Sequence, residues 1–305
     1  MITNNTKVGI VVPTRNRPEN IKNFLASIER SSIHPAVCVI VDSSDSAYEL
    51  PVCSFPLLFE TPGIRGQVNQ RNYGIHLLKK FGGVEYALLL DDDIVLKPEA
   101  ISEAMDGIKR YVRNDPGFVG FALNVINLRK SNHIYRRLLL HPKRPGTVTT
   151  STFCSSLSNL DSDTECDWVL GGAAVWNLDF LIKNPSDYPF SGKAYSEDLY
   201  YCSIVRDHAR FAALSKARCA HIDFYEIKKA DNISRLAYIE GVNDAKIRIF
   251  IAKNFRQYSV PMTAMHILWV GCLGVVFGSA SLDRTAFMLG IGRITGLMKS
   301  TGIKK

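Results

Sequence analysis

The sequence lacks the cysteine pattern of a disulfide-stapled or zinc-stapled protein. Its seven cysteines are odd in number, widely spaced and include no C-x-x-C pair, so neither a disulfide framework nor a structural zinc site is indicated. The N-terminus, Met-Ile-Thr-Asn-Asn-Thr-Lys, also lacks the apolar segment of a signal peptide. We therefore expect a cytoplasmic location.

Most of the chain also lacks an excess of charge of either sign. Residues 1–225 carry 25 basic and 24 acidic side chains, whereas residues 226–305 carry 12 and 5, which together give the net charge of +8. A nucleic-acid-binding body is therefore disfavoured. The basic C-terminal part favours an anionic partner such as the headgroups of a membrane.

Apolar runs and turn signals predict alternating strands and helices in the first hundred residues. Strands are expected over residues 8–12, 36–41 and 86–90, with helices beginning near Pro18 and spanning residues 67–80. This order is typical of an α/β domain with a mostly parallel central sheet flanked by helices, which we place at residues 1–225. Ligands of such sheets bind beyond the carboxyl ends of the strands.

Later segments are less regular. Residues 146–166 are rich in Ser and Thr, which predicts a long mobile loop of the kind that often lies over an active site. Glu197 opens a predicted helix, and residues 211–214 predict another strand.

The C-terminal extension, residues 226–305, is expected to be helical. Residues 257–282 carry no Asp, Glu, Lys or Arg, and the stretch 264–282 approaches the length needed to span a bilayer, so it spans a membrane, lies on one or packs inside the protein. Next, Phe287, Ile291, Ile294 and Met298 form an apolar stripe among basic residues. Such a stripe suits a helix at a membrane interface or one docked on the protein.

An acidic triplet, Asp91-Asp92-Asp93, follows the predicted strand at residues 86–90. Alternation along a strand would put Asp91 and Asp93 on one side. Two carboxylates at a strand end can bind Mg²⁺ or Mn²⁺, which commonly share their oxygen ligands with substrate phosphates. A solvated acidic loop is the alternative interpretation.

Several short fragments in a fixed order extend this pattern: VVPTRNRP at residues 11–18, VDSSDS at 41–46, QRNYGI at 70–75, the acidic triplet, Gly171-Gly172 and SEDL at 196–199. Together they resemble the inverting family 2 glycosyltransferases, whose nucleotide-sugar domain has the GT-A fold. The resemblance covers roughly residues 7–225. It implies hexosyl transfer from a nucleotide sugar that is assisted by Mn²⁺ or Mg²⁺.

The resemblance also implies roles for individual positions. Asp198 matches the catalytic base, and Asp93 matches a metal ligand, with His221 as a second candidate. The acceptor side would include Gly171, Gly172 and Glu197. The donor side would include Pro13, Thr14, Arg15, Asp42, Arg71, Asp91 and Asp92. Other interpretations stay open: Glu197 and Asp198 could cap a helix N-terminus, Arg71 could be a surface arginine and His221 a structural residue.

Two features of the family are missing. Phe190 is followed by Ser191-Gly192 instead of an acidic residue, which leaves the acceptor side less well matched than the donor side. The Gln-x-x-Arg-Trp signature of processive synthases is also absent, since no tryptophan follows an arginine. We therefore expect one sugar per encounter.

The sequence favours a metal-dependent inverting glycosyltransferase that moves a single sugar to a hydroxyl of a glycan or lipid-linked acceptor, in bacterial cell-surface polysaccharide synthesis. We expect it on the inner face of the cytoplasmic membrane as a peripheral protein. A sugar-1-phosphate nucleotidyltransferase is disfavoured because its Gly-rich N-terminal loop is absent. An inactive transferase-like protein that binds nucleotide sugars or acts as a membrane scaffold is the alternative.

Overall fold

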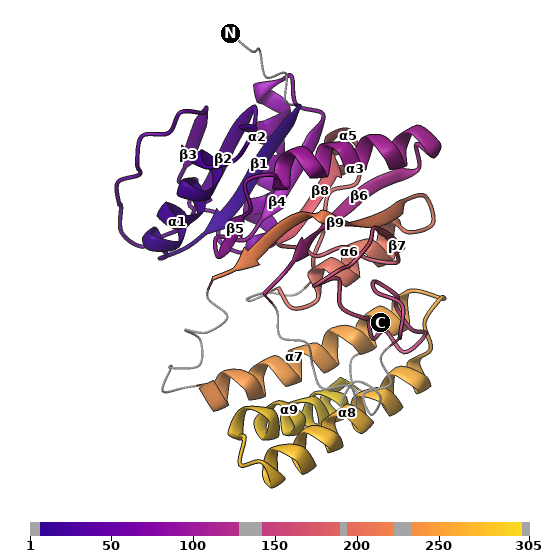
Figure 1. Cartoon of the computed structure of the whole chain (residues 1–305). Helices are drawn as coiled ribbons and strands as arrows, with labels where there is room; N and C mark the ends of the chain where they lie inside the picture. Colours follow the sequence, from indigo (N-terminus) through magenta and orange to yellow (C-terminus); the bar gives the residue numbers. More distant parts are fainter. Residues whose placement is uncertain (1–6, 128–141, 190–193, 223–232, 301–305) are drawn as a thin grey trace. The chain divides into compact units, whose positions relative to one another are not determined.

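The computed structural model describes residues 7–127, 142–189, 194–222 and 233–300 (Figure 1). The chain forms two compact units. The first contains residues 1–129 and 156–222, and the second contains residues 130–155 and 223–305. Residues 130–155 therefore belong to the same unit as the C-terminal helices, although they interrupt the first unit in the sequence. Phe190, Ser191 and Gly192 lie outside the described residues.

The first unit is built on a nine-stranded sheet with the order β3-β2-β1-β4-β8-β6-β9-β5, and β7 pairs with β9. Its strands are β1 (Val8–Thr14), β2 (Val37–Asp42), β3 (Leu57–Glu60), β4 (Tyr86–Leu90), β5 (Ile94–Leu96), β6 (Phe118–Val125), β7 (Thr164–Cys166), β8 (Ala173–Asn177) and β9 (Arg210–His221). The expected parallel order holds from β3 to β4. Beyond β4 the sheet is mixed, because β8 runs antiparallel to both β4 and β6.

Helices cover both faces of this sheet, which confirms the expected fold class. The helices α1 (Pro18–Glu29) and α3 (Ala100–Asn114) share a buried cluster with the side chains of Ile10 and Leu88. On the opposite face, α2 (Gln67–Phe81) packs closely, since a Cβ on its Gly74 would collide with Val11. Two shorter helices, α5 (Leu178–Lys183) and α6 (Glu197–Val205), follow β8. The predicted start of α1 and the predicted boundaries of α2 and β4 agree with these to within about two residues.

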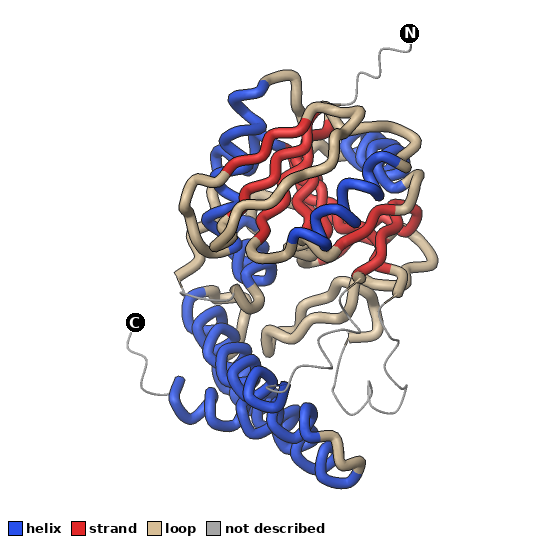
Figure 2. The backbone as a smooth tube through the Cα atoms, turned by 90° about the vertical axis from the view of Figure 1, so that its left-hand side faces the viewer, coloured by secondary structure: helices blue, strands red, loops and turns tan. Residues whose placement is uncertain are grey.

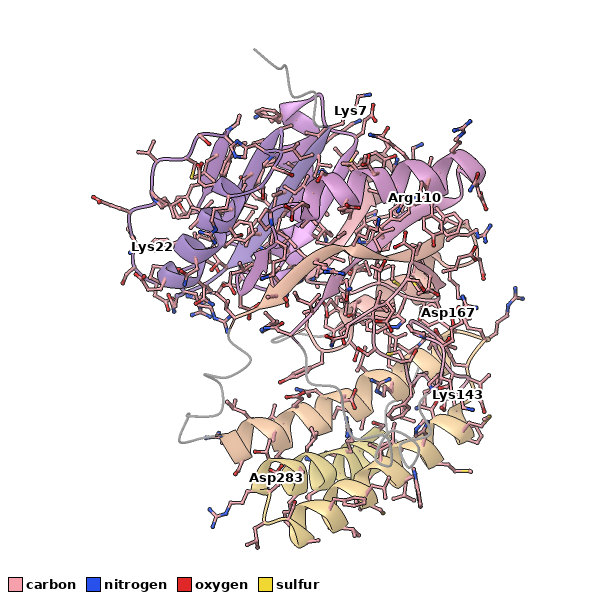
Figure 3. The ribbon with its side chains drawn as sticks, in the orientation of Figure 1. Lys7, Lys22, Arg110, Lys143, Asp167 and Asp283 are labelled. Atoms are coloured by element: carbon pink, nitrogen blue, oxygen red, sulfur yellow. The ribbon has the colours of Figure 1, made fainter. Side chains whose placement is uncertain are left out.

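Lys22 and Arg110 lie on the surface of this unit (Figure 3). Lys22 pairs with the exposed Glu19 at 2.7 Å, and Arg110 pairs with the half-buried Asp163 at 2.9 Å. Exposed pairs of this kind contribute little to stability, because water and salt screen them. Water and salt screen buried charged groups much less, so this argument does not apply to them.

The second unit is helical. It contains α7 (Ile233–Asn254), α8 (Val260–Ala280) and α9 (Arg284–Ser300), drawn as long helices in Figure 2. Ser259 caps α8, because its hydroxyl accepts a hydrogen bond from the amide of Met262. By length and composition, α8 is the one described helix that could cross a membrane.

Helix α9 packs mainly through small residues, and only part of the expected apolar stripe takes part, since Ile294 lies against Gly271 of α8. Its buried positions are Gly290, Gly292, Gly296 and Ser300, whereas Met298 is 70% exposed. A Cβ on Gly292 would collide with the carbonyl of Tyr238 on α7. The stripe as a whole is therefore not the docked face, although Ile294 contributes to it. Backbones that approach this closely leave no room for larger side chains.

The Ser/Thr-rich segment expected to be a mobile loop is packed. Phe153 stacks on His266 with ring centroids 3.8 Å apart, and the guanidinium of Arg248 lies over the Phe153 ring, 4.3 Å from its centroid. In the first unit, Asn124 exchanges hydrogen bonds with the backbone of Leu160. Composition misled the prediction, because the hydroxyl groups bond locally while a few apolar side chains anchor the segment.

Candidate functional site

Polar side chains gather where β1, β2 and β4 end. Thr14 is the last residue of β1 and pairs in register with Asp42, the last residue of β2. Asp91 directly follows β4, which pairs with the other side of β1. Because these three strands are parallel, their carboxyl ends lie at one edge of the sheet, as expected for a ligand site.

Two of the three acidic residues share one arginine. Nη1 of Arg17 donates to Oδ1 of Asp92 at 2.8 Å and to Oδ2 of Asp93 at 3.2 Å. The hydroxyl of Thr14 donates to Asp92 at 2.7 Å. These contacts hold Asp92 against the end of β1 and the residues that follow it. They also compensate part of the charge of both buried carboxylates.

Burial nevertheless dominates the titration of Asp92. It raises the pKa of Asp92 to about 6, although the bond from Thr14 and the charge of Arg17 act in the opposite direction. A carboxylate in this state is costly to keep charged without a further cation. The surroundings of Asp92 therefore favour a bound positive charge.

Asp93 and His221 form the pair that could hold a metal ion. Nε2 of His221, at the end of β9, lies 3.3 Å from Oδ1 of Asp93. Two ligands on neighbouring positions of an octahedral ion stand roughly 3 Å apart, so this spacing fits Mg²⁺ or Mn²⁺. The described residues contain no group of three His, Cys, Asp or Glu that could hold a metal. The remaining ligands would have to come from water and substrate oxygens.

The first acid of the triplet belongs to a different group. Nη2 of Arg71 donates to Oδ1 of Asp91 at 2.5 Å, and Nε2 of Gln67 donates to the same oxygen at 2.6 Å. Nη1 of Arg71 donates to Oε1 of Glu197 at 2.8 Å. Arg71 is buried, so its interpretation as a surface arginine is wrong.

The grouping also corrects the expected alternation. Strand β4 ends at Leu90, and Asp92 and Asp93 lie in a turn. The rule that every second side chain shares a face no longer applies there. Asp92 and Asp93 consequently share Arg17, while Asp91 faces α2.

Gly171 and Gly172 make room for the carboxylates. A Cβ on Gly172 would collide with the carboxylate of Asp91, and one on Gly171 would collide with Glu197. The amide of Asp91 also donates to the carbonyl of Gly172 at 2.9 Å. Only glycine lets the backbone lie this close to both acids.

Glu197 and Asp198 lie in the first turn of α6. Burial, followed by the charge of Asp198, raises the pKa of Glu197 to about 7 against the attraction of Arg71. Oδ2 of Asp198 accepts a bond from the amide of Gly171 at 3.3 Å, and Oδ1 accepts one from Leu199 at 2.7 Å. Glu197 is thus engaged by Arg71, whereas Asp198 is held by two amides.

A pocket opens beside these two acids. Its polar lining includes Arg71, Glu197 and Asp198, and its apolar lining includes Leu89 and Trp176. A small concave space with an apolar wall and a few polar groups is typical of a site for an organic ligand. The pocket places Asp198 next to a space that a substrate could enter.

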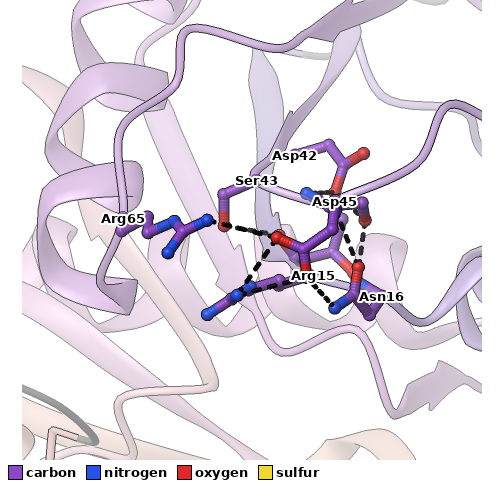
Figure 4. Close-up of polar contacts among 8 residues, drawn as sticks. Arg15, Asn16, Asp42, Ser43, Asp45 and Arg65 are labelled. Carbon is purple, nitrogen blue, oxygen red and sulfur yellow. Dashed lines mark hydrogen bonds and ion pairs between the residues drawn. The ribbon is translucent and has the colours of Figure 1, made fainter.

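Asp42, the last residue of β2, and Asp45, just after the strand, are drawn together in Figure 4. Arg15, Asn16 and Arg65 converge on Asp45, with distances of 3.2 Å from Arg15 and 3.1 Å from Arg65. The bonds from Asn16 and Arg15 lower the pKa of Asp45. The predicted donor residue Arg15 is therefore exposed and paired with Asp45, away from the acidic triplet.

Two other predicted donor residues have structural contacts. Asp42 is buried and accepts bonds from the amide and hydroxyl of Ser44 at 2.9 and 2.6 Å. Pro13 is buried inside β1 opposite Val41. Pro13 thus shapes the strand and presents no polar group.

Three residues at the site were missed in the sequence. Arg17 and Gln67 bind the acidic triplet directly, and nothing in the sequence distinguished Arg17 from Arg15. The third is Tyr48, whose buried hydroxyl has no hydrogen-bond partner among the described residues. Burial, with the charges of Asp42 and Asp92, raises the pKa of Tyr48. Its position near both carboxylates depends on the tertiary fold, and no local sequence motif predicts it.

Comparison with solved structures identifies the fold. No family model matches the chain, and no curated protein sequence matches it. The mannosyltransferase PcManGT from Pyrobaculum calidifontis, solved in complex with GDP-Man and Mn²⁺, is 15% identical with a TM-score of 0.52, covering 98% of this chain and 88% of its own. Residues 1–349 of S. aureus TarS are also 15% identical, with a TM-score of 0.49 over 95% of this chain and 91% of theirs.

The likeness to the mannosyltransferase concerns the fold. It shows that the chain shares the fold of this mannosyltransferase, with a mixed α/β part and a helical C-terminal part. Function has to be argued from the site itself, because one fold can carry different activities.

Proposed function

We propose that the protein is a glycosyltransferase that uses a metal ion to transfer a single hexosyl group from a nucleotide-diphosphate sugar, with inversion at the anomeric carbon. One observation carries the proposal. Within a glycosyltransferase fold, Arg71 joins the acidic triplet to the Glu197-Asp198 pair, so donor-side and acceptor-side acids meet at one edge of the sheet. This agrees with the resemblance to family 2 enzymes.

The donor would lie over the ends of β1 and β2. Tyr48 and Asp42 offer a hydroxyl and a carboxylate, which can read the polar groups of a base or ribose. The mannosyltransferase of the same fold binds GDP-Man, which supports a nucleotide-diphosphate sugar as the donor class. Arg17 is placed to meet the negative charge of a diphosphate once a ligand enters.

Asp93 and His221 would hold the metal ion. A bound Mn²⁺ or Mg²⁺ would neutralise the charge that develops on the departing nucleoside diphosphate. The surroundings support this role, since burial makes the charged form of Asp92 unfavourable without a nearby cation. The Mn²⁺ in the mannosyltransferase complex supports the same class of ion.

Asp198 would act as the general base. The amides of Gly171 and Leu199 orient its carboxylate beside the pocket, where it can take the proton from an acceptor hydroxyl. Direct attack by that hydroxyl on the anomeric carbon, opposite the leaving diphosphate, inverts the configuration. Glu197 is bound to Arg71 and positions the site instead of exchanging protons with the acceptor.

The acceptor would be a hydroxyl of a glycan or of a lipid-linked sugar, in cell-surface polysaccharide synthesis. A lipid-linked acceptor would place the enzyme at the inner face of the cytoplasmic membrane.

A donor screen tests this function. Thermal unfolding is measured with UDP-, GDP- and dTDP-sugars, with and without Mn²⁺. We expect one nucleotide class to raise Tm by several degrees in the presence of Mn²⁺ only, and Asp93→Asn to lose that increase. If no nucleotide sugar shifts Tm, the proposal is wrong.

A further inference from the structure

Helix α8 presents an apolar face on which several large side chains are exposed. Met262, Met265, Trp269 and Val276 are 50, 69, 44 and 62% exposed. With Cys272 they follow steps of three and four residues, so they line one side of the helix over about 21 Å. The apolar face of α8 consists of Met262, Met265, Leu268, Trp269, Cys272, Val276 and Phe277. Soluble monomers rarely expose a continuous face of this kind.

The opposite side of α8 is fixed in the helical unit. Gly274 and Gly278 pack so closely on α9 that a Cβ at either position would contact its backbone. His266 also faces inward, where its Nδ1 lies 2.7 Å from the hydroxyl of Ser151. The apolar face is therefore held outward by a rigid contact on the other side.

A buried ionic group in the helical unit argues against a membrane-crossing helix. The helices packed with α8 contain a buried ionic group in which Asp244 binds both Arg248 at 2.7 Å and Arg293 at 3.1 Å. If α8 crossed a bilayer in this unit, its neighbours would carry those charges into the hydrocarbon, which is costly. A helix lying along the surface leaves them on the side away from the lipid.

A basic residue flanks each end of the apolar face. Arg256 precedes α8 and Arg284 follows it, both exposed, and the exposed Asp283 stands beside Arg284. Residues 142–155 and 233–300 together carry ten basic and three acidic side chains, and Asp244 is already bound to two of the arginines. The exposed excess is thus basic, which complements an anionic surface.

We propose that the apolar face of α8 binds the surface of an anionic lipid bilayer, with the helix parallel to the membrane plane. Apolar side chains would enter the boundary between headgroups and acyl chains, while Arg256 and Arg284 contact anionic headgroups. The face lies in the helical unit, so this binding does not depend on the catalytic residues. A lipid surface fits better than a second copy of the chain, whose own basic ends would repel.

The test uses the full chain and preformed vesicles of phosphatidylcholine and phosphatidylglycerol in equal parts, with pure phosphatidylcholine vesicles for comparison. We expect sedimentation with the anionic vesicles, binding at least tenfold weaker to the neutral ones, and release by alkaline carbonate. Trp269 should give a blue-shifted fluorescence on binding, because Trp168 and Trp176 are already buried. Trp269→Phe should lose that shift.

A matched pair of variants isolates the face. Met265→Glu with Val276→Glu should lower binding at least tenfold, whereas Val52→Glu with Phe81→Glu adds the same charge at exposed apolar positions of the other unit and should leave binding unchanged. Circular dichroism and Tm check that both variants fold.

Four results would overturn the inference: no binding to anionic vesicles, equal loss in the two variants, resistance to carbonate extraction, or a dimer by light scattering that the Met265/Val276 variant dissociates. Resistance to carbonate extraction would indicate a helix that crosses the membrane. A dimer of this kind would indicate a contact between copies of the chain.

Discussion

Arg71 lies between two acids that are far apart in the sequence. Its guanidinium binds Glu197, 126 positions away, at 2.8 Å and Asp91 at 2.5 Å. One buried arginine thus connects the end of β4 with the start of α6. The consequences for stability, titration and activity can be measured separately.

Arg71→Met should strongly destabilise the protein. Removing one partner of a buried ionic group leaves the other charges uncompensated, which typically costs about 3–5 kcal/mol. The free energy of unfolding in urea at pH 8 measures this loss. A decrease of less than about 1 kcal/mol, the range of exposed pairs, would contradict the central position of Arg71.

Glu197 should make stability fall as the pH rises. Its pKa is raised from 4.5 to about 7 in the folded protein, so between these values the folded state binds more protons than the unfolded state. The favourable contribution is complete below about pH 4.5 and is lost as the pH rises through 7. Urea unfolding from pH 5 to 8 should show this decline, to which Asp92 adds in the same direction below about pH 6.

Glu197→Gln is the control for that titration. It should flatten the decline between pH 5 and 8 without a large change at pH 5, where Glu197 is mostly protonated. A decline as steep as in the wild-type protein would assign the pH dependence to another group.

Tyr48→Phe should separate ligand binding from stability. The hydroxyl is buried with no described hydrogen-bond partner, so its removal should leave Tm unchanged or slightly higher. If the hydroxyl serves the nucleotide, affinity for the donor should fall about tenfold, as measured by calorimetry. Unchanged affinity would remove Tyr48 from the donor site.

Gly292→Ala should destabilise the helical unit. The new methyl group would collide with the carbonyl of Tyr238 and force α7 and α9 apart, which typically costs about 1–3 kcal/mol. Met298→Ala, on the exposed side of the same helix, should change stability by less than about 0.5 kcal/mol. Equal effects of the two substitutions would contradict the glycine-mediated packing.

Local patterns predicted the elements of the sheet well but not the contacts between them. The strand at Tyr86–Leu90 agrees residue for residue, because its apolar run is bounded by acids. The resemblance pointed to Arg71, which binds Asp91. The contact of Arg17 with Asp92 and Asp93 was not predictable, since Arg17 reaches them from another element. The apolar stripe on α9 indicated the interface only in part: Ile294 lies against α8, but the helices approach so closely that glycines fill most of the contact.

The catalytic assignment of Asp198 is tested most directly by turnover of the bound donor. Release of nucleoside diphosphate is measured for the wild-type protein and Asp198→Asn, with the donor found by thermal shift, Mn²⁺ and a membrane extract as acceptor source. We predict a rate at least a hundredfold lower in Asp198→Asn, with unchanged donor affinity and Tm. Full turnover in this variant would contradict it.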